Sequence, residues 1–201
     1  MRRIFALSLV LLMLFAFVGC GDGGDELEAT HEAVIEIENY GTIKLELYGN
    51  TAPITVENFE KLANSGFYNG LTFHRIMENF MMQGGCPKGD GTGDAGEDIK
   101  GEFTNNGVQN NISHKRGVIS MARNGSSYYD DYLYYNTASC QFFIVHQDSP
   151  HLDGNYASFG MVIEGIEVVD KVCTEAKPID ANGSIPKDQQ PIIKSITVTK
   201  K

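Results

Sequence analysis

Short segments in which apolar and polar residues alternate recur along this chain, and they constrain its fold more than any other feature. Residues 43–47, Ile-Lys-Leu-Glu-Leu, alternate cleanly, and residues 34–38 do so in part. Alternation with a period of two is typical of a strand that buries one face and exposes the other. Asn39-Tyr40-Gly41 between the two segments is a turn sequence, so we expect a hairpin.

Six further strand-like segments follow the hairpin: residues 72–77, 80–83, 117–122, 141–145, 158–162 and 192–199. Two helices interrupt them. Thr55 is placed to cap the first helix, with Glu57 in its first turn and Ser65-Gly66 at its end, and the second helix covers residues 166–173. Because the last segment alternates and can pair with the hairpin, we predict a mostly β fold, a closed antiparallel eight-stranded barrel capped by two α-helices.

Residues 1–19 have a different character from the rest of the chain. Arg2 and Arg3 precede an almost unbroken apolar run over residues 4–18. As a helix this run would rise only about 22 Å, short of a bilayer core of about 30 Å, and that length is typical of a secretory signal peptide. The run ends at Gly19-Cys20, which resembles a bacterial lipobox, whose cysteine is lipidated. The alternative is an ordinary cleaved signal peptide with a chance cysteine.

We therefore expect a lipoprotein signal peptide over residues 1–19, a flexible polar tether over residues 20–32 with a lipid on Cys20, and one folded domain over residues 33–201. This arrangement predicts a protein outside the cytoplasm, anchored to the bacterial cell membrane through Cys20. The formal net charge is −10, and no basic stripe is present, which argues against a nucleic-acid partner.

Standard cofactor and metal chemistry has little support in the sequence. Residues 91–96 match a G-x-G-x-x-G pattern, but they open no helix, and Asp94 would repel a pyrophosphate. Ser149, His151 and Asp153 are close in sequence, although a catalytic triad is assembled by the fold. The five histidines have no metal-ligand spacing, so we expect neither a metal nor a cofactor. Buried thiols, with at most one disulfide among them, are expected at the remaining cysteines, Cys86, Cys140 and Cys173.

An arginine in an apolar setting is the most distinctive residue of the chain. Arg75 is followed by Ile76, and on a strand these two side chains point to opposite faces. Arg75 then lies beside a patch that includes Phe80, Met81 and Gln83. A guanidinium among apolar groups is costly unless it is hydrogen-bonded or has a chemical role. The spacing alone leaves a structural and a functional arginine equally open.

The block at residues 73–85 resembles the signature of the cyclophilin family. Three further blocks stand in that family's order, at residues 117–123, 139–144 and 151–160. The resemblance covers residues 33–199, essentially the whole predicted domain. It implies a cyclophilin-like barrel and peptidyl-prolyl cis-trans isomerase activity.

This resemblance also implies roles for the residues at matching positions. Arg75 takes the place of the catalytic arginine, and Gln83 is the second member of the catalytic set. Gln83 and Gln141 match polar groups that position the peptide, while Ala122 matches part of the peptide-binding edge. Four side chains match the pocket that holds the substrate proline ring: Phe80, Met81, Phe143 and Leu152.

Four features depart from the family pattern. Tyr156 stands where many members have a histidine that contacts the substrate carbonyl, and a phenol can still donate a hydrogen bond. Arg123 replaces an asparagine whose main chain contacts the peptide. His151 replaces a tryptophan that contributes to cyclosporin binding, so we expect weak cyclosporin binding. Residues 126–135 form a tyrosine-rich insertion, which either extends the substrate-binding surface or packs on its own barrel.

The function implied is rotation of X–Pro bonds in proline-containing polypeptides, namely exported proteins that are folding. A guanidinium that donates to the prolyl nitrogen competes for the lone pair that stiffens the amide, so Arg75 is expected to stabilise the twisted state. The alternative is a cyclophilin-like chaperone or scaffold that binds proline-containing segments without important catalysis.

Overall fold

The computed structural model describes residues 27–125 and 131–201, which form eight strands, two α-helices and four short 3₁₀ turns. The strands are β1 (His31–Ile37), β2 (Gly41–Leu47), β3 (Phe73–Met77), β4 (Met81–Gly84), β5 (Val118–Met121), β6 (Phe142–Val145), β7 (Ser158–Glu164) and β8 (Ile193–Lys200). The helices are α1 (Pro53–Asn64) and α2 (Ile166–Glu175). The predicted signal peptide and Cys20 lie outside the described residues. No helix within the described ranges has the length and apolar character needed to cross a membrane.

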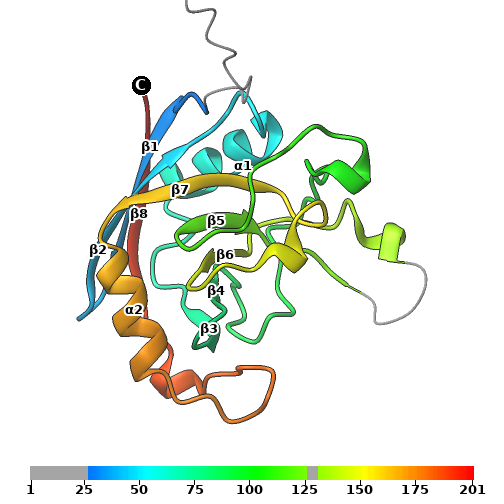
Figure 1. The fold of residues 1–201 in the computed structure, drawn as a ribbon. Helices are drawn as coiled ribbons and strands as arrows, with labels where there is room; N and C mark the ends of the chain where they lie inside the picture. Colours follow the sequence, from blue (N-terminus) through cyan, green and yellow to red (C-terminus); the bar gives the residue numbers. More distant parts are fainter. Residues whose placement is uncertain (1–26, 126–130) are drawn as a thin grey trace, which may run out of the picture.

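The eight strands form one antiparallel sheet in the order β3-β4-β6-β5-β7-β2-β1-β8, which curls around the core (Figure 1). The predicted class, eight antiparallel strands with two helices, is therefore confirmed. The predicted closed barrel needs correction, because no ladder pairs the edge strands β3 and β8, and the residues just before them are joined by an isolated bridge between Thr72 and Ile192. Phe73 N–H donates to the carbonyl of Pro191 (2.9 Å), but Pro191 has no N–H to return the bond, so no continuous ladder closes the sheet.

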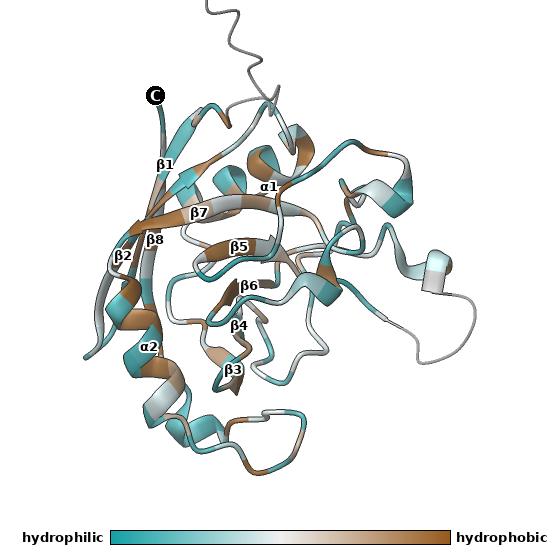
Figure 2. Ribbon diagram, in the orientation of Figure 1, coloured by the Kyte–Doolittle hydropathy of each residue, from teal (hydrophilic) through white to brown (hydrophobic). Residues whose placement is uncertain are grey.

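The predicted hairpin is β1 and β2, which pair from His31 opposite Leu47 to Ile37 opposite Gly41. Buried residues alternate along both strands, with Ile35 and Leu45 fully buried. β1 begins ahead of the predicted domain boundary at residue 33. Apolar residues gather on the strands and polar residues on the connecting loops (Figure 2). The period-two pattern thus sets which face of the hairpin covers the core.

Strands β4 and β6 are buried on both faces, and this property creates the candidate site. Met82 and Ile144 point inward to the main core, where aromatic rings such as Phe59 and Phe142 pack edge-on. Their neighbours on the strands point outward and join a second, smaller apolar cluster that includes Met81, Val145 and Phe143. An alternating strand with two apolar faces therefore serves two separate clusters.

Helix α1 packs against β8, and α2 packs against β2 and β4. The prediction that Thr55 caps α1 is wrong, because the helix begins at Pro53 and Thr55 lies buried within its first turn. Glu57 also lies beyond the first turn. Proline is well suited to the first helical position. The backbone N–H groups of the first turn, which have no partner within the helix, donate hydrogen bonds to a residue in a loop distant in sequence. The carboxylate of Glu102 accepts from the Ile54 and Thr55 N–H groups at 3.2 and 2.8 Å.

Candidate active site

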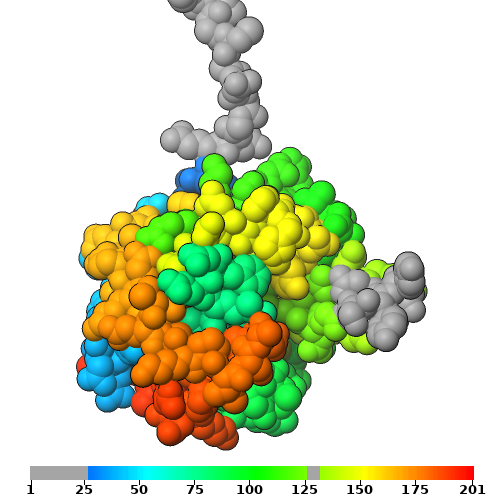
Figure 3. Space-filling view, turned by 60° about the horizontal axis from the view of Figure 1, so that its bottom comes forward, coloured from blue at the N-terminus to red at the C-terminus, as the bar shows by residue number. Residues whose placement is uncertain are grey.

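The outward-facing side of β3, β4 and β6 holds a pocket of about 140 Å³. Arg75 pairs with Gln83 across β3 and β4, and Gln83 pairs with Phe143 across β4 and β6. These three residues therefore lie side by side across the sheet. Figure 3 shows the surface of residues 75–80 between the segments that follow β6 and α2. Nine residues line the pocket: Arg75, Phe80, Met81, Gln83, Ala122, Arg123, Phe143, Leu152 and Tyr156.

The sequence predicted all nine of these residues as site residues. Two further predicted residues lie just outside the pocket. Gln141 lines an adjoining polar hollow of about 210 Å³, which shares Gln83, Ala122 and Arg123 with the pocket. His151 is exposed at the rim, with its ring centroid 5.5 Å from that of Phe80.

Arg75 is held from three sides. Its Nε donates to the carbonyl of Asn182 at 2.7 Å, and one terminal nitrogen lies 3.3 Å from Gln83 Oε1. The other terminal nitrogen lies 3.4 Å from the sulfur of Met77. Burial lowers the pKa of Arg75 from its ordinary value, although Tyr156 and Asp180 oppose this, and a guanidinium remains charged at any working pH. The site thus holds a fixed, partly desolvated cation.

A chain of side-chain amides continues from Arg75 into a loop. Gln83 Nε2 donates to Gln141 Oε1 at 3.1 Å. Gln141 Nε2 in turn donates to the carbonyls of Gly91 and Gly93 at 2.9 and 2.8 Å. Each amide has a defined partner on both sides, so the orientation of Gln83 beside Arg75 depends on the glycine-rich loop.

The opposite wall of the pocket is apolar. Met81, Phe143 and Leu152 are buried, and the ring of Tyr156 meets that of Phe143 edge-on at 5.7 Å. A cation on one wall and packed carbon on the other suit a ligand with an apolar ring next to a group that accepts hydrogen bonds.

Sequence reasoning missed His114, which lies behind this apolar wall. Its ring stacks on Phe143 with centroids 5.9 Å apart, Nδ1 lies 2.8 Å from Asp153, and Nε2 lies 3.1 Å from the hydroxyls of Ser120 and Ser158. Burial lowers the pKa of His114, while Asp153 opposes the shift. No local pattern distinguishes this histidine in the sequence, because the fold supplies its partners.

Arg123 separates the pocket from the adjoining hollow. Its guanidinium carbon lies 4.8 Å from the ring centroid of Tyr156 and 5.2 Å from that of Tyr135, and its Nε donates to the carbonyl of Asn155. Tyr135, at the end of the tyrosine-rich insertion, also packs edge-on against Phe103. Tyr132 is 63% exposed. The tyrosines at positions 128 and 129 lie outside the described residues, so the insertion's predicted recognition role stays a prediction.

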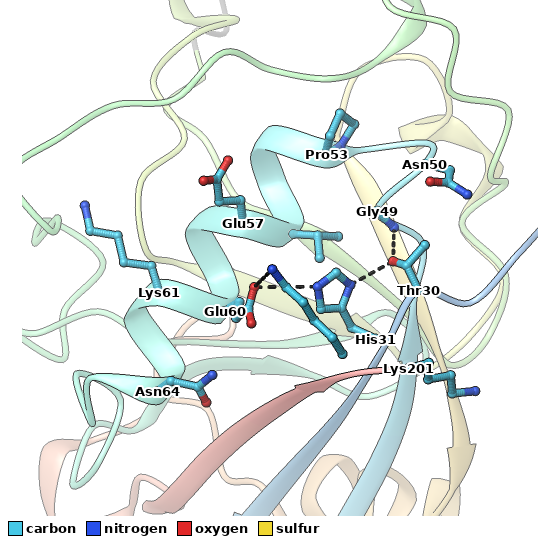
Figure 4. Close-up of a pocket in the computed structure, with 12 residues that line it drawn as sticks. Thr30, His31, Gly49, Asn50, Pro53, Glu57, Glu60, Lys61, Asn64 and Lys201 are labelled. Atoms are coloured by element: carbon cyan, nitrogen blue, oxygen red, sulfur yellow. Dashed lines mark hydrogen bonds and ion pairs between the residues drawn. The ribbon is translucent and has the colours of Figure 1, made fainter.

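A larger hollow of about 730 Å³ lies between the start of β1, α1 and the end of β8 (Figure 4). Within it, His31 and Lys200 lie 3.5 and 3.6 Å from the Glu60 carboxylate. None of the predicted site residues lines it. Among the described residues no group of three histidine, cysteine or acidic side chains is arranged to hold a metal ion.

Comparisons with known proteins agree with this geometry. The family model described as cyclophilin type peptidyl-prolyl cis-trans isomerase matches residues 33–198. The chain is 47% identical to peptidyl-prolyl cis-trans isomerase B of Bacillus subtilis over 131 residues, which cover 65% of this chain and 82% of the relative. It is 45% identical to a peptidyl-prolyl cis-trans isomerase of Helicobacter pylori over 150 residues, 74% of this chain and 83% of the relative.

A solved structure of a cyclophilin type peptidyl-prolyl cis-trans isomerase from Cryptosporidium parvum matches the fold with a TM-score of 0.71 and 30% identity, covering 86% of this chain and 99% of that chain. The matched family region includes every residue that lines the pocket and all of the sheet except the first two residues of β1 and the last two of β8. The chain therefore belongs to the cyclophilin family and is an enzyme of the peptidyl-prolyl cis-trans isomerase class.

Proposed function

We propose that this protein accelerates rotation of X–Pro bonds in exported polypeptides as they fold, with Arg75 stabilising the twisted amide. The observation that carries the proposal is the Arg75 guanidinium, which is fixed by Asn182 and Gln83 against an apolar pocket. Family membership supplies the reaction class, and the arrangement of this pocket supports the role of each residue.

The chemistry follows from the stiffness of the amide. An X–Pro bond resists rotation by about 18–20 kcal/mol because the nitrogen shares its lone pair with the carbonyl. In the twisted state that lone pair is localised and can accept a hydrogen bond. A guanidinium already in place stabilises this state more than the planar ground state, which lowers the barrier.

The apolar wall supplies the other half of the mechanism. Met81, Phe143 and Leu152 would hold the proline ring, while the carbonyl on its N-terminal side turns. Tyr156 would donate to that carbonyl, and Gln83 and Gln141 would position the peptide. Rotation of this kind requires no covalent intermediate.

The direct test measures isomerisation of a proline tetrapeptide by the wild type and by Arg75→Ala and Arg75→Lys. We expect kcat/KM to fall about 100-fold or more in Arg75→Ala, the usual effect of removing a preorganised donor. Arg75→Lys should recover little, because one ammonium cannot reproduce the fork of donors. Arg116→Ala is the matched control, since Arg116 pairs with Asp170 away from the pocket.

Unchanged activity in Arg75→Ala would refute the mechanism. Tight binding of proline-containing peptides by a wild type that does not accelerate their isomerisation would favour the chaperone or scaffold alternative.

The proposal also covers where the protein is located and how strongly it binds cyclosporin. The apolar run over residues 4–18 and the Gly19-Cys20 sequence support a lipid on Cys20 that anchors the domain to the outside of the bacterial cell membrane. A tether of residues 20–32 would let the domain meet chains that emerge from the membrane. The exposed imidazole of His151 at the pocket rim supports weak cyclosporin binding.

A further inference from the structure

Cys86 follows the end of β4, and Cys140 precedes the start of its antiparallel neighbour β6. The two strands pair with Met81 opposite Val145 and Gly84 opposite Phe142. Continuing that register places Cys86 opposite Cys140. Gly85, with φ of +82°, turns the chain after β4, yet a Cβ on Gly85 would lie only 2.8 Å from the Cys140 carbonyl oxygen. The two backbones therefore remain in contact at this point.

The strand ladder ends at Gly84 and Phe142, and beyond it the two thiols lie near enough for Cys86 to act electrostatically on Cys140, whereas a disulfide needs their Cβ atoms to come within about 3.5–4.5 Å. Both thiols are free and buried. Burial, followed by the proximity of Cys86, raises the pKa of Cys140 to about 12. The third thiol, Cys173, lies in α2 and has Asp170 and Glu78 as its charged neighbours. Cys86 and Cys140 are thus the two thiols that can pair with each other, whereas Cys173 lies elsewhere in the fold.

Cys86 is the more reactive member of this pair. Its sulfur accepts a hydrogen bond from the Gly93 N–H at 3.3 Å and lies 3.9 Å from the Asp90 carboxylate. Burial alone would raise the pKa of Cys86, but backbone N–H groups of the same loop hold it below its ordinary value. Because the thiolate is the nucleophile, Cys86 is the thiol that attacks first. Gly93, whose N–H contacts the Cys86 sulfur, lines the polar hollow beside the pocket together with Cys140, so an external disulfide would approach Cys86 through this hollow by displacing the loop at Gly93.

We propose that Cys86 and Cys140 form a reversible disulfide that slows the enzyme. The Cys86 thiolate attacks an external disulfide and expels one thiol, forming a mixed disulfide. Cys140 loses its proton, attacks the Cys86 sulfur and expels the second thiol. Two protein thiols are oxidised to one disulfide, and one external disulfide is reduced to two thiols.

The effect on activity follows from the amide chain, and this half of the inference rests on the proposed function. A sulfur drawn toward Cys140 gives up the Gly93 N–H, so the loop that carries Gly91 and Gly93 loses an internal anchor. The carbonyls of these two glycines hold Gln141, which holds Gln83 beside Arg75. Oxidation thus loosens the positioning of the Arg75 guanidinium.

The test compares full-length protein in detergent after incubation with dithiothreitol or with oxidised glutathione, followed by alkylation and peptide mass mapping. We expect a cross-linked peptide pair containing Cys86 and Cys140, and kcat/KM lower by about five-fold, the effect of one net hydrogen bond. Adding dithiothreitol should restore the activity. Cys86→Ser and Cys140→Ser should each abolish both the cross-link and the response to oxidation. Cys173→Ser is the matched control and should retain both.

Alkylation of both thiols after oxidation, or cross-linking of either cysteine to Cys173 instead, would overturn the proposed site. A Cys86–Cys140 cross-link with no change in kcat/KM would overturn the regulatory role. Peptide mass mapping detects the cross-link whether or not the protein is active. If the reduced protein shows no isomerase activity, that result counts against the proposed function, and the mass mapping still tests the disulfide.

Discussion

The rim of the pocket carries His151, the residue on which the expectation of weak cyclosporin binding rests. His151 packs its ring against Phe80 at a tilt of 32°, outside the nine residues that line the pocket. An imidazole offers less apolar area than an indole, and aromatic area at a rim contributes to the binding of large apolar ligands. The pocket floor is left intact by this replacement.

Replacing this histidine tests the rim directly. We expect His151→Trp to tighten cyclosporin binding by about fivefold, since an added aromatic contact contributes roughly 1 kcal/mol beyond its area. Titration calorimetry on the wild type and the variant measures the change. Ile163→Trp, at an exposed position on β7, is the matched control and should leave the affinity unchanged. Tight binding by the wild type would contradict the prediction.

A second residue-scale prediction concerns His74, next to Arg75 on β3. Burial, followed by the charge of Arg75, lowers the pKa of His74 from 6.5 to about 4, and its Nδ1 has no hydrogen-bond partner within the described residues. Between these two values the unfolded chain binds a proton that the folded chain does not. Stability is therefore fully present above pH 6.5 and falls as the pH drops toward 4.

The difference of pKa corresponds to about 3 kcal/mol at the acid end. Thermal unfolding of the wild type and His74→Gln at several pH values measures it. We expect the variant to lose less stability than the wild type over this range, whatever its stability at neutral pH. Parallel curves for the two proteins would show that His74 does not titrate as described.

The side chains of this site could be predicted from the sequence, but the backbone carbonyl groups that position them could not. Arg75, Phe143 and their partners sit in dense blocks that resemble a known family, so their positions were predictable. The carbonyls that hold Arg75 and Gln141 come from Asn182, Gly91 and Gly93, where no side chain signals the role. These contacts depend on where the loops pass close to the sheet. The alternation of apolar and polar residues along the strands does not predict the path of the loops.

Among the secondary-structure elements, the start of α1 also could not be predicted from the local sequence. The strand pattern predicted the hairpin correctly because alternation and burial have the same period. The predicted cap of α1 was wrong because the acceptor for its first N–H groups is not close in sequence. Glu102, distant in sequence and only 3% exposed, supplies the carboxylate that a capping residue would otherwise provide.

Removing this carboxylate should therefore destabilise the domain through one helix terminus. We expect Glu102→Ala to lower the free energy of unfolding by about 2–3 kcal/mol, since it leaves two N–H groups and the Thr55 hydroxyl without their acceptor. Urea denaturation measures the change. Glu57→Ala, on the exposed side of the same helix, should cost less than about 0.5 kcal/mol. Equal losses in the two variants would argue against this role for Glu102.

For the whole molecule, the anchor is the feature to test. If Cys20 carries lipid, Cys20→Ser should move the protein from the membrane fraction to the soluble extracytoplasmic fraction, because the lipid supplies the membrane affinity. Fractionation with immunoblotting measures the distribution, and Cys173→Ser, which leaves Cys20 in place, is the control. Retention of Cys20→Ser in the membrane would contradict lipid anchoring through this cysteine.

The pairing of β1 with β8 has a consequence for the order of folding. These strands contain the beginning and the end of the described chain, and Lys201 N–H donates to the carbonyl of Thr30. During synthesis or translocation, β1 has no β8 to pair with until all the strands between them have emerged. Contacts of such sequence separation form slowly. The hairpin of β1 and β2 therefore keeps one edge unpaired until β8 has emerged, and the sheet is completed only at that stage.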